Sequence, residues 1–508
     1  MADNNYRTMF HIMPPKGWLN DPNGLCYYKN MYHVFFQYSP DNANGGDKYW
    51  GHYTSDNLVE FKFAGISVSP DTEYDKNGAY SGSAFIKDDE LYVYYTGNVK
   101  TSGEHDIDRT YSGRTANTIL IKSKDGMNFG NKKLLMNNDD YPNEYTCHVR
   151  DPKVWTENGK YFMIQGGRID GRIAKDKTYK HDIKENREKG HSEDIGAAII
   201  FQSDNLENWN VLREIKLCDK IGNNIRFGYM WECPDYFKIA GLDENSGILS
   251  LCPQGLEKTK YQYQNIYQSG YFIVQGDILD RESKLEFSGF SEWDMGFDFY
   301  APQTFRDESG RRIMIGWAGM PDAEYDNEPT VKEGWQHVLT VPRELKFCDG
   351  RIYQKPVAEL DLLRENKENV LSETRYEKRD FDKCFDMLIN FENDYNVFRF
   401  KISDTLSDAA LELRCESGEI VLEFTGEEAF SAGRGRKIRR LKIESIRNFR
   451  ILADTSIVEI YLNDGEYVFT TRYYMNAKKN ILFEADKSFC VEIYEINKKC
   501  IYFKEGLE

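Results

Sequence analysis

Short runs of alternating apolar and polar residues dominate the chain, and turn-forming residues separate them. In the first two thirds, five pairs of such runs enclose a polar turn and predict β-hairpins, over residues 25–39, 84–97, 153–167, 236–255 and 304–319. A Ser-x-Asp/Asn segment ending on an aromatic residue follows the first three, at 55–61, 123–129 and 203–209. The hairpin turns lie about 60 to 90 residues apart, and short strands at such a period are typical of the blades of a β-propeller.

The pattern changes after about residue 343. Residues 356–369 predict a short amphipathic helix or a linker, and many short period-2 strands follow, as in a β-sandwich. With 508 residues, the chain exceeds the size at which one core stops growing. We therefore expect an all-β protein: a five-bladed β-propeller over 1–345, a linker over 346–370 and a β-sandwich over 371–508.

One segment, residues 168–194, is densely charged and nearly without apolar residues. It separates the third hairpin from the next apolar strand. We expect a surface insertion there, partly helical and without a catalytic role.

A short polar motif precedes each hairpin, and three of the five motifs carry a carboxylate: Asp21, Asp151 or Glu232. In a propeller the first strand of each blade lines the central channel, so residues at equivalent starts converge on one end of the axis. Residues 21–24, Asp-Pro-Asn-Gly, predict a β-turn that opens the inner strand of the first blade. The predicted β-sandwich has no such set of acids at its strand starts, so we assign the chemistry to the propeller.

Two carboxyl groups that flank a sugar bond are the minimum apparatus for glycoside hydrolysis. Proximity of like charges and partial burial raise the pKa of one of them, which then acts as the acid, and a third can bind ring hydroxyls. Flat apolar faces and polar groups near the motifs suit a sugar: Trp18, Trp50, Tyr80, Trp231 and Trp317, with Asn20, Gln37, Ser81 and Arg150. An aromatic residue taken singly more commonly packs in a core, but adjacency to the acids favours a binding role for Trp317 and Tyr80.

The composition of the chain limits the classes of molecule that we expect it to bind. A net charge of −17 disfavours nucleic acid and anionic membranes, and the basic run at 433–440 predicts a solvated hairpin. The eight histidines form no metal-binding spacing and there is no phosphate-binding glycine loop, so we expect neither a metal nor a cofactor. Ten cysteines without paired spacing, an N-terminus without a signal-peptide pattern and the lack of a membrane-length apolar run predict a cytoplasmic protein with reduced thiols.

Several ordered motifs resemble glycoside hydrolase family 32, which includes invertases, fructan hydrolases and sucrose-6-phosphate hydrolases. They are WLNDPNG (18–24), FFQYSP (35–40), YWGH (49–52), SGSA (81–84), RDPKV (150–154) and WECPDYF (231–237). Residues 264–272, 310–319 and 341–345 look like the bacterial intracellular sucrose-hydrolysing branch, and 450–474 are similar to the family's C-terminal signature. The resemblance covers nearly the whole chain.

The resemblance implies a retaining release of fructose from a β-fructofuranoside. By matching motif, Asp21 would be the nucleophile, Glu232 the general acid/base and Asp151 the transition-state stabiliser, held by Arg150. The fructosyl-binding pocket would contain Asn20, Gln37, Ser81 and Trp317.

Two departures from the family pattern concern the pocket wall. Many members carry a Trp where residues 41–47 stand here, so that wall is absent or supplied by Trp50. Tyr80 stands where Phe is frequent and adds a hydroxyl at the rim.

Two alternatives to a sucrose hydrolase stay open: a fructosyltransferase with the same chemistry, and a non-catalytic sugar-binding propeller. A phosphorylated substrate would need a cation at the pocket mouth, for which Lys48 and His52 are the nearby candidates, although acidic residues surround them.

Overall fold

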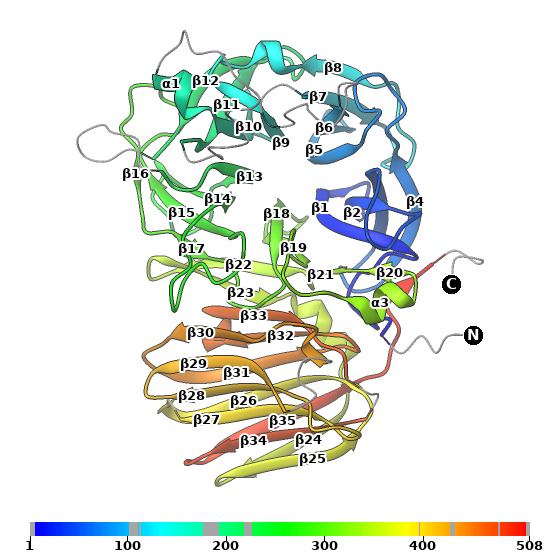
Figure 1. The fold of residues 1–508 in the computed structure, drawn as a ribbon, viewed down its shortest axis with the longest axis vertical. Coiled ribbons are helices and arrows are strands. Elements are labelled where there is room, and N and C mark those ends of the chain that lie inside the picture. The colour runs from blue at the N-terminus through cyan, green and yellow to red at the C-terminus, as the bar shows by residue number, and fades with distance from the viewer. Residues whose placement is uncertain are drawn as a thin grey trace.

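Five β-sheets surround a common axis in the computed structural model, and a two-sheet sandwich lies against one side of this ring (Figure 1). The structure describes residues 6–100, 110, 113–175, 193–217, 226–395, 397–426, 432–475 and 478–503. The innermost strands are β1, β5, β9, β13 and β18; each contacts the next, and β18 contacts β1, which closes the ring. The predicted five-bladed propeller followed by a β-sandwich is confirmed.

The first two sheets contain the predicted hairpins 25–39 and 84–97. Blade one consists of β1 (Gly17–Tyr28), β2 (Met31–Ser39), β3 (Tyr49–Ser55) and β4 (Phe61–Val68), with β20 (Trp335–Gln336) and β36 (Ile501–Tyr502) at its edges. Blade two consists of β5 (Ala79–Lys87), β6 (Glu90–Lys100), β7 (Arg114–Ser123) and β8 (Lys133–Met136), followed by the 3-10 turn η1 (Asn138–Asp140). Because β20 and β36 come from much later in the chain, they tie the first blade to the rest of the molecule.

The other three blades contain the remaining predicted hairpins. Blade three consists of β9 (Tyr145–Glu157), β10 (Lys160–Ile169), β11 (Ile195–Ser203) and β12 (Asn210–Ile215). Blade four consists of β13 (Met230–Phe237), β14 (Ser246–Gln254), β15 (Gly270–Gln275), β16 (Glu286–Phe287) and β17 (Ser291–Glu292). Blade five consists of β18 (Tyr300–Arg306), β19 (Arg312–Ala318), β21 (Val338–Leu339), β22 (Arg343–Cys348) and β23 (Arg351–Pro356), with the short helix α3 (Glu328–Lys332) before β20.

Local turn chemistry explains the hairpins. Two-residue loops with positive φ at both positions join β1 to β2 at Lys29-Asn30, β5 to β6 at Asp88-Asp89 and β9 to β10 at Asn158-Gly159. This left-handed pair matches the twist of the flanking strands. The recurring Ser-x-Asp/Asn segments are also alike in three dimensions, because Ser55, Ser123 and Ser203 each hydrogen-bond the Asx side chain two residues later.

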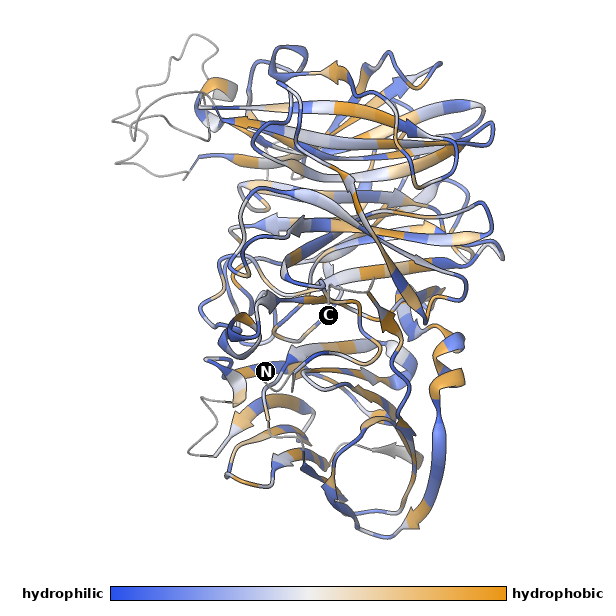
Figure 2. Ribbon diagram, turned by 90° about the vertical axis from the view of Figure 1, so that its right-hand side faces the viewer, coloured by the Kyte–Doolittle hydropathy of each residue, from blue (hydrophilic) through white to orange (hydrophobic). Residues whose placement is uncertain are grey.

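The sandwich packs two six-stranded antiparallel sheets around a separate apolar core. One sheet contains β24 (Glu365–Ser372), β35 (Phe489–Ile496), β26 (Cys384–Tyr395), β31 (Ile446–Ala453), β32 (Ile457–Leu462) and β33 (Tyr467–Arg472). The other contains β25 (Arg375–Phe381), β34 (Lys479–Ala485), β27 (Phe398–Asp404), β28 (Ala410–Glu416), β29 (Glu419–Thr425) and β30 (Ile438–Lys442). Hydrophobic and hydrophilic residues alternate along many strands in both regions, as the sequence pattern predicts (Figure 2).

Three local expectations differ from the structure. Residues 21–24 do not form a β-turn: all four lie inside β1, where Pro22 pairs with Phe36 and Asn23 with Phe35, and a bulge lies on either side of these two pairs. In the segment 356–369, only the 3-10 turn η2 (Ala358–Leu363) is helical, and β24 begins at Glu365. The basic run at 433–440 is not solvated throughout, because Arg436 is fully buried and pairs with Asp298 at 2.7 Å across the contact between the propeller and the sandwich.

The charged segment 168–194 is described only at its ends. β10 continues to Ile169, the short helix α1 (Gly171–Lys175) follows, and the chain is described again from Glu193. The predicted surface insertion therefore lies largely outside the described residues. No helix in the described part of the chain is long and apolar enough to cross a membrane.

Candidate active site

A β-bulge interrupts all five innermost strands at the same level of the propeller. In each, two residues stand opposite one residue of the next strand. The bulged pairs are Asn20-Asp21 on β1, Tyr80-Ser81 on β5, Asp151-Pro152 on β9, Cys233-Pro234 on β13 and Ala301-Pro302 on β18. The strand starts thus carry a repeated structural device, which the polar motifs of the sequence mark.

The three carboxylates stand at neighbouring positions of this repeat and not at one equivalent position. Asp21 is the second bulged residue, Asp151 is the first, and Glu232 directly precedes the bulge. Asp151 and Cys233 have φ values of 61° and 47°, which are uncommon for residues other than glycine. Such strain at a bulge re-aims side chains, and here it brings side chains of different blades together.

Asp21 is held by donors from blades one and two. Ser81 Oγ donates to Asp21 Oδ2 at 2.5 Å, and Gln37 Nε2 donates to the same oxygen at 3.3 Å. Asn20 Nδ2 donates to Asp21 Oδ1 at 2.9 Å, while Trp18 Nε1 holds Asn20 through its amide oxygen at 2.9 Å. These bonds orient the carboxylate.

Asp151 is buried with little counter-charge. Its carboxylate accepts the backbone N–H of Cys233 at 2.9 Å, and the Cys233 thiol lies 3.6 Å from Asp151 Oδ2 and 3.8 Å from Asp21 Oδ2. Burial raises the pKa of Asp151 to about 7; Arg150 opposes the shift, and the charges of Glu232 and Asp21 add to it. The thiol between Asp21 and Asp151 shows that these two acids face one another across blades one, three and four.

Glu232 is held through one oxygen only. Tyr300 Oη donates to Glu232 Oε2 at 2.8 Å, and Gln254 Nε2 donates to the same atom at 2.7 Å. Among the described residues the nearest charged partner of Oε1 is Arg150, at 3.8 Å. Because Oε2 already accepts two hydrogen bonds, a proton on this carboxyl belongs on Oε1, as a proton donor requires. Arg150, expected to hold Asp151, thus makes its ion pair with Glu232.

An aromatic wall stands beside the acids. The ring of Trp317 contacts Trp18 at 6.2 Å, Tyr300 at 6.4 Å and His337 at 4.9 Å between centroids. Trp317 is 3% exposed, and its indole N–H has no hydrogen-bond partner among the described residues; the same holds for both ring nitrogens of His337. Buried donors of this kind are usually satisfied by a ligand or water, which marks this wall as a polar-lined binding surface.

Other aromatic residues expected near the acids do not form this wall. Trp50 is fully buried and donates its indole N–H to the carbonyl of Tyr80 at 3.0 Å, so it packs between blades one and two. Trp231 is also fully buried and donates to the carbonyl of Phe227 at 2.7 Å. Tyr80 is half-buried at the bulge of β5, and its hydroxyl makes no hydrogen bond to an acid among the described residues. The core-packing alternative therefore describes both tryptophans.

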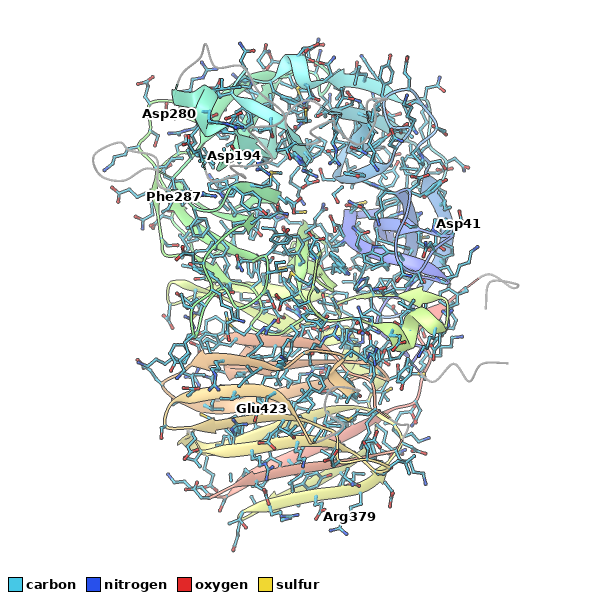
Figure 3. The ribbon with its side chains drawn as sticks, in the orientation of Figure 1. Asp41, Asp194, Asp280, Phe287, Arg379 and Glu423 are labelled. Atoms are coloured by element: carbon cyan, nitrogen blue, oxygen red, sulfur yellow. The ribbon has the colours of Figure 1, made fainter. Side chains whose placement is uncertain are left out.

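Residues 41–47, which stand where many family members carry a tryptophan, lie next to Lys48. Asp41, at the start of this segment, is exposed at the edge of the first blade (Figure 3). A Cβ atom placed on Gly45 would lie 3.8 Å from the Trp18 ring and 3.9 Å from Lys48 Nζ. The ammonium group of Lys48 stands 5.1 Å from the centroid of the Trp18 ring, and burial lowers its pKa to about 8. His52, the other cationic candidate, is 1% exposed and hydrogen-bonds His33 at 3.0 Å inside blade one, away from the surface.

Sequence reasoning missed four residues that hold the site: Asn23, Cys233, Gln254 and Tyr300. Asn23 and Cys233 lie inside recognised motifs, but the motif alone does not show that they support other side chains. Asn23 is fully buried and, with its amide placed to satisfy both groups, bonds Ser81 and the backbone of Gln37. Gln254 and Tyr300 end and begin strands of blades four and five, and only the fold brings them to Glu232.

The described residues contain no group of three or more His, Cys, Asp or Glu side chains that could hold a metal ion. The carboxylates and hydrogen-bond donors at the site suit acid, base and nucleophilic chemistry on a neutral or anionic polyol, with Trp317 as an apolar face and Lys48 as a cation.

Comparisons with known proteins agree with this geometry. The N-terminal domain model of glycosyl hydrolases family 32 matches residues 11–191 and 188–356, and its C-terminal model matches 365–495. The chain is 37% identical over 473 residues to a sucrose-6-phosphate hydrolase of Bacillus subtilis, covering 92% of this chain and 89% of that protein.

Two solved structures share the fold. The sucrose-6-phosphate hydrolase of Lactobacillus gasseri matches with a TM-score of 0.81 and 27% identity over 98% of this chain and 94% of that one. A Bombyx mori family 32 β-fructofuranosidase in complex with sucrose matches with a TM-score of 0.78 and 26% identity, over 98% and 95% of the two chains.

Proposed function

The chain belongs to glycosyl hydrolases family 32, and from this membership and its site we infer that it is a β-fructofuranosidase that hydrolyses sucrose-type substrates. The observation that carries the chemistry is the convergence of Asp21, Asp151 and Glu232 from three blades. The Cys233 thiol lies between Asp21 and Asp151, and Arg150, the residue before Asp151, pairs with Glu232. A small-molecule sugar is the corresponding partner.

We assign the nucleophile to Asp21 and the general acid/base to Glu232. In the first step an oxygen of Asp21 forms a bond to the anomeric carbon of the fructosyl unit, while Glu232 protonates the departing glycosidic oxygen. In the second step Glu232 takes a proton from water, and the resulting attack on the same carbon releases fructose and Asp21 with retention. This assignment requires the two carboxyl groups to stand ~5–5.5 Å apart.

Asp151 is the proposed transition-state stabiliser. Its buried carboxylate has few counter-charges, so a positively charged oxocarbenium-like fructosyl unit would favour its ionised form and gain from it. Asn20, Gln37 and Ser81 hydrogen-bond Asp21 and supply polar groups for the fructosyl hydroxyls. Trp317, which contacts Trp18, supplies an apolar face for the ring. Transfer of the fructosyl group to a sugar would use the same residues, so product analysis at high sucrose separates hydrolysis from transfer.

The preferred substrate is, in our proposal, sucrose that carries a phosphate group. Lys48 supports this: its ammonium group is largely buried beside Trp18, within electrostatic reach of Asp21, and makes no ion pair with any carboxylate in the described part of the chain. A phosphate oxygen would supply the missing partner. The sucrose-6-phosphate hydrolases of Bacillus subtilis and Staphylococcus xylosus, at 37% and 36% identity, agree with such a substrate.

The test is kcat/KM on sucrose, sucrose 6-phosphate, kestose and inulin. We expect sucrose 6-phosphate to be best, and Lys48→Met to lower its kcat/KM by about 10- to 100-fold while changing that for sucrose little, since a charged hydrogen bond contributes about 1.5–3 kcal/mol. Lys62→Met, an exposed lysine on the outer strand of the same blade, is the control. An equal loss on both substrates would assign Lys48 to positioning of Trp18 and not to phosphate.

We place the domain boundary between β23 and β24, within residues 357–364, because β22 and β23 complete blade five inside the segment expected to be a linker. A cytoplasmic location is supported by the free thiols of the nine cysteines in the described residues.

A further inference from the structure

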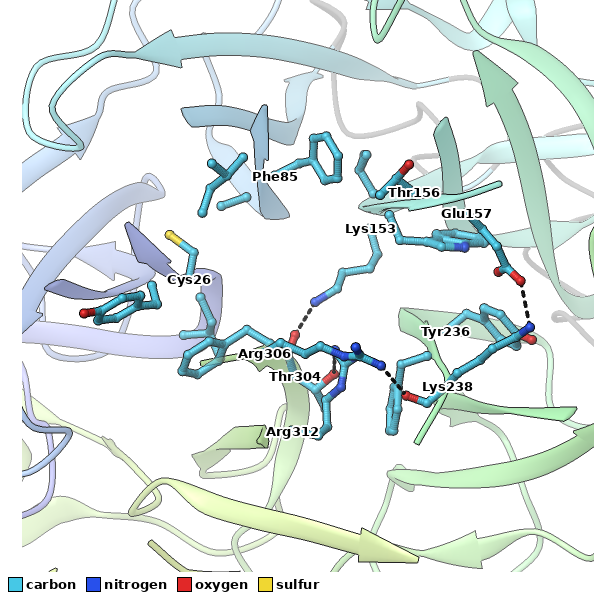
Figure 4. Close-up of a pocket in the computed structure, with 18 residues that line it drawn as sticks. Cys26, Phe85, Lys153, Thr156, Glu157, Tyr236, Lys238, Thr304, Arg306 and Arg312 are labelled. Atoms are coloured by element: carbon cyan, nitrogen blue, oxygen red, sulfur yellow. Dashed lines mark hydrogen bonds and ion pairs between the residues drawn. The ribbon is translucent and has the colours of Figure 1, made fainter. Parts of the chain in front are cut away.

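A second opening lies at the other end of the channel. The same five innermost strands continue past their bulges, and three or more consecutive residues of each line a pocket of about 470 Å³ (Figure 4). Blade five adds Arg312 from β19. None of the three catalytic carboxylates lines this pocket, so it is separate from the site described above.

Four cationic side chains face the pocket: Lys153, Lys238, Arg306 and Arg312. Two of them have carboxylate partners. Lys153 lies 3.2 Å from Asp235, and Lys238 lies 2.7 Å from Glu157. Each lysine is therefore neutralised by its own carboxylate, and the net positive charge of the pocket comes from the two arginines.

Neither arginine has a carboxylate partner among the described residues. Arg306 is exposed, and its guanidinium donates to the carbonyl of Lys238 at 3.3 Å. Arg312 stacks on Phe237, with the guanidinium carbon 4.8 Å from the ring centroid, and donates to the Thr304 hydroxyl at 3.4 Å. The Nε atom of Arg312 is buried without a hydrogen-bond partner in the described structure.

The two guanidinium groups repel each other. Burial lowers the pKa of Arg312 to about 10, and the charge of Arg306 lowers it further, while Asp235 acts in the opposite direction. This pocket therefore carries net positive charge, although the net charge of the whole chain is −17. This arrangement favours a bound anion, because an anion between two guanidinium groups removes their repulsion.

We propose that this far-end pocket binds the phosphate group of a small phosphorylated molecule, between Arg306 and Arg312. A doubly charged phosphate matches two guanidinium groups, whose planar forks suit its oxygens. The volume exceeds what a phosphate fills, and the aromatic side chains of Trp155 and Tyr236 line the remainder, which suits a sugar-sized body.

The binding test uses isothermal titration calorimetry of the full chain with inorganic phosphate, glucose 6-phosphate and glucose at constant ionic strength. The Lys48→Met background removes phosphate binding at the proposed catalytic pocket, so that remaining binding reports on the far end. We expect binding of glucose 6-phosphate and of phosphate, and none of glucose. Equal affinity for the two phosphates would identify free phosphate as the ligand; tighter glucose 6-phosphate would identify a sugar phosphate.

Arg306→Gln, Arg312→Gln and the double variant locate the site. We expect each single variant to weaken binding at least about tenfold and the double variant to abolish it. Arg379→Gln, an exposed arginine of the sandwich visible in Figure 3, is the matched control. Arg306 is exposed, so Arg306→Gln should fold normally. Arg306→Gln therefore tests the site even if Arg312→Gln, which loses the stacking on Phe237, is destabilised. Unchanged affinity in Arg306→Gln, or equal binding of chloride and phosphate, would overturn the proposal.

This result and the proposed hydrolase activity fail separately. The far-end arginines do not contact the catalytic acids, so the variants should keep the wild-type kcat/KM on sucrose. If they lose phosphate binding and keep hydrolysis, the pocket is an independent anion site.

Discussion

Two groups of buried carboxylates in this molecule have opposite electrostatic surroundings. At the catalytic end of the propeller, Asp151 has one backbone donor and a thiol, and its pKa is raised to about 7. Where the propeller meets the sandwich, Glu459 is completely buried, yet Arg343 and His11 lower its pKa to about 2. Burial is similar in the two places, so the counter-charges decide the sign of the shift.

The contact between propeller and sandwich shows how a buried carboxylate is neutralised. Arg343 Nη2 donates to Glu459 at 2.6 Å, and His11 lies 3.1 Å from Glu459 and 2.9 Å from Asp454. Asp454 also accepts three backbone N–H groups of residues 9–11. Asp294 shares the same arginine, and there burial prevails and raises its pKa to about 6. Between the propeller and the sandwich, the polar contacts of the buried carboxylates join the two domains. At the catalytic end, fewer counter-charges leave the carboxylates available for reaction.

The largest effect should come from removing the catalytic acids. Asp21→Ala should lower kcat on sucrose by about 10⁴-fold or more, because it deletes the atom that forms the covalent bond. Glu232→Gln should lower kcat by about 10²- to 10⁴-fold, since only proton transfer is lost. Steady-state kinetics on purified protein measures both.

Neither variant should unfold the protein. Thermal denaturation monitored by circular dichroism is the control for Asp21→Ala and Glu232→Gln. Retention of full sucrose hydrolysis by either one would show that the assigned roles of these two residues are wrong.

Breaking the contact between the domains should affect stability instead of catalysis. Glu459→Gln removes one of the two carboxylates that Arg343 and His11 each contact, and removal of one partner from a buried ion pair costs about 3–5 kcal/mol of unfolding free energy. Guanidinium chloride denaturation measures the change, and kcat per folded molecule should stay near the wild-type value. Glu466→Gln, whose partner Arg351 is half-buried at the surface, should change the denaturation midpoint far less.

The same carboxylate-to-amide change should have the opposite sign at the catalytic end. The folded-state pKa of Asp151 is raised, so folding favours its neutral form, and the cost of its charge appears as pH rises from its ordinary range to about 7. Asp151→Asn removes that cost. We expect it to abolish most activity and to raise the unfolding free energy by about 1–3 kcal/mol at pH 8, and by less at pH 5.

Denaturation of Asp151→Asn and Glu459→Gln at the two pH values compares the regions directly. The depressed pKa of Glu459 makes its contribution complete above the ordinary carboxyl range and lost as pH falls toward about 2. Both substitutions should therefore show their full effect at pH 8, with opposite signs. Destabilisation of both variants at pH 8 would remove the distinction between the two regions.

The sequence alone predicts the features that depend on neighbouring residues. Alternating apolar residues and Asn-Gly or Lys-Asn turns predict the five hairpins, because two-residue turns and strand twist are local properties. Their order around the axis then assigns Asp21, Asp151 and Glu232 to one end of the channel, and the structure places donors from several blades around them. A motif at a strand start is sufficient for that much.

What the sequence does not predict depends on distant contacts. Asp-Pro-Asn-Gly has the local preferences of a turn, but pairing with β2 draws it into a bulged strand. The positive φ of Asp151 and Cys233 goes against their residue types and is imposed by the blade. Trp50 looks like a pocket wall and is core, while Arg436 looks solvated and is buried against Asp298.

The smallest expected effect concerns the thiol between the acids. The Cys233 thiol lies 3.6 Å from Asp151 Oδ2 and is a weak hydrogen-bond donor. A serine hydroxyl in its place donates more strongly to the ionised carboxylate, which lowers the pKa of Asp151. Cys233→Ser should therefore move the acidic limb of the kcat/KM profile down by about half to one pH unit and reduce the stability gain of Asp151→Asn.

The pH profile of Cys490→Ser, a half-buried cysteine of the sandwich, is the control and should match the wild type. A lowered limb in Cys233→Ser would show that weak donation to Asp151 keeps this carboxylate near neutrality. An unchanged limb would assign the acidic titration to another carboxyl of the catalytic group, since titrations of interacting acids belong to the group as a whole.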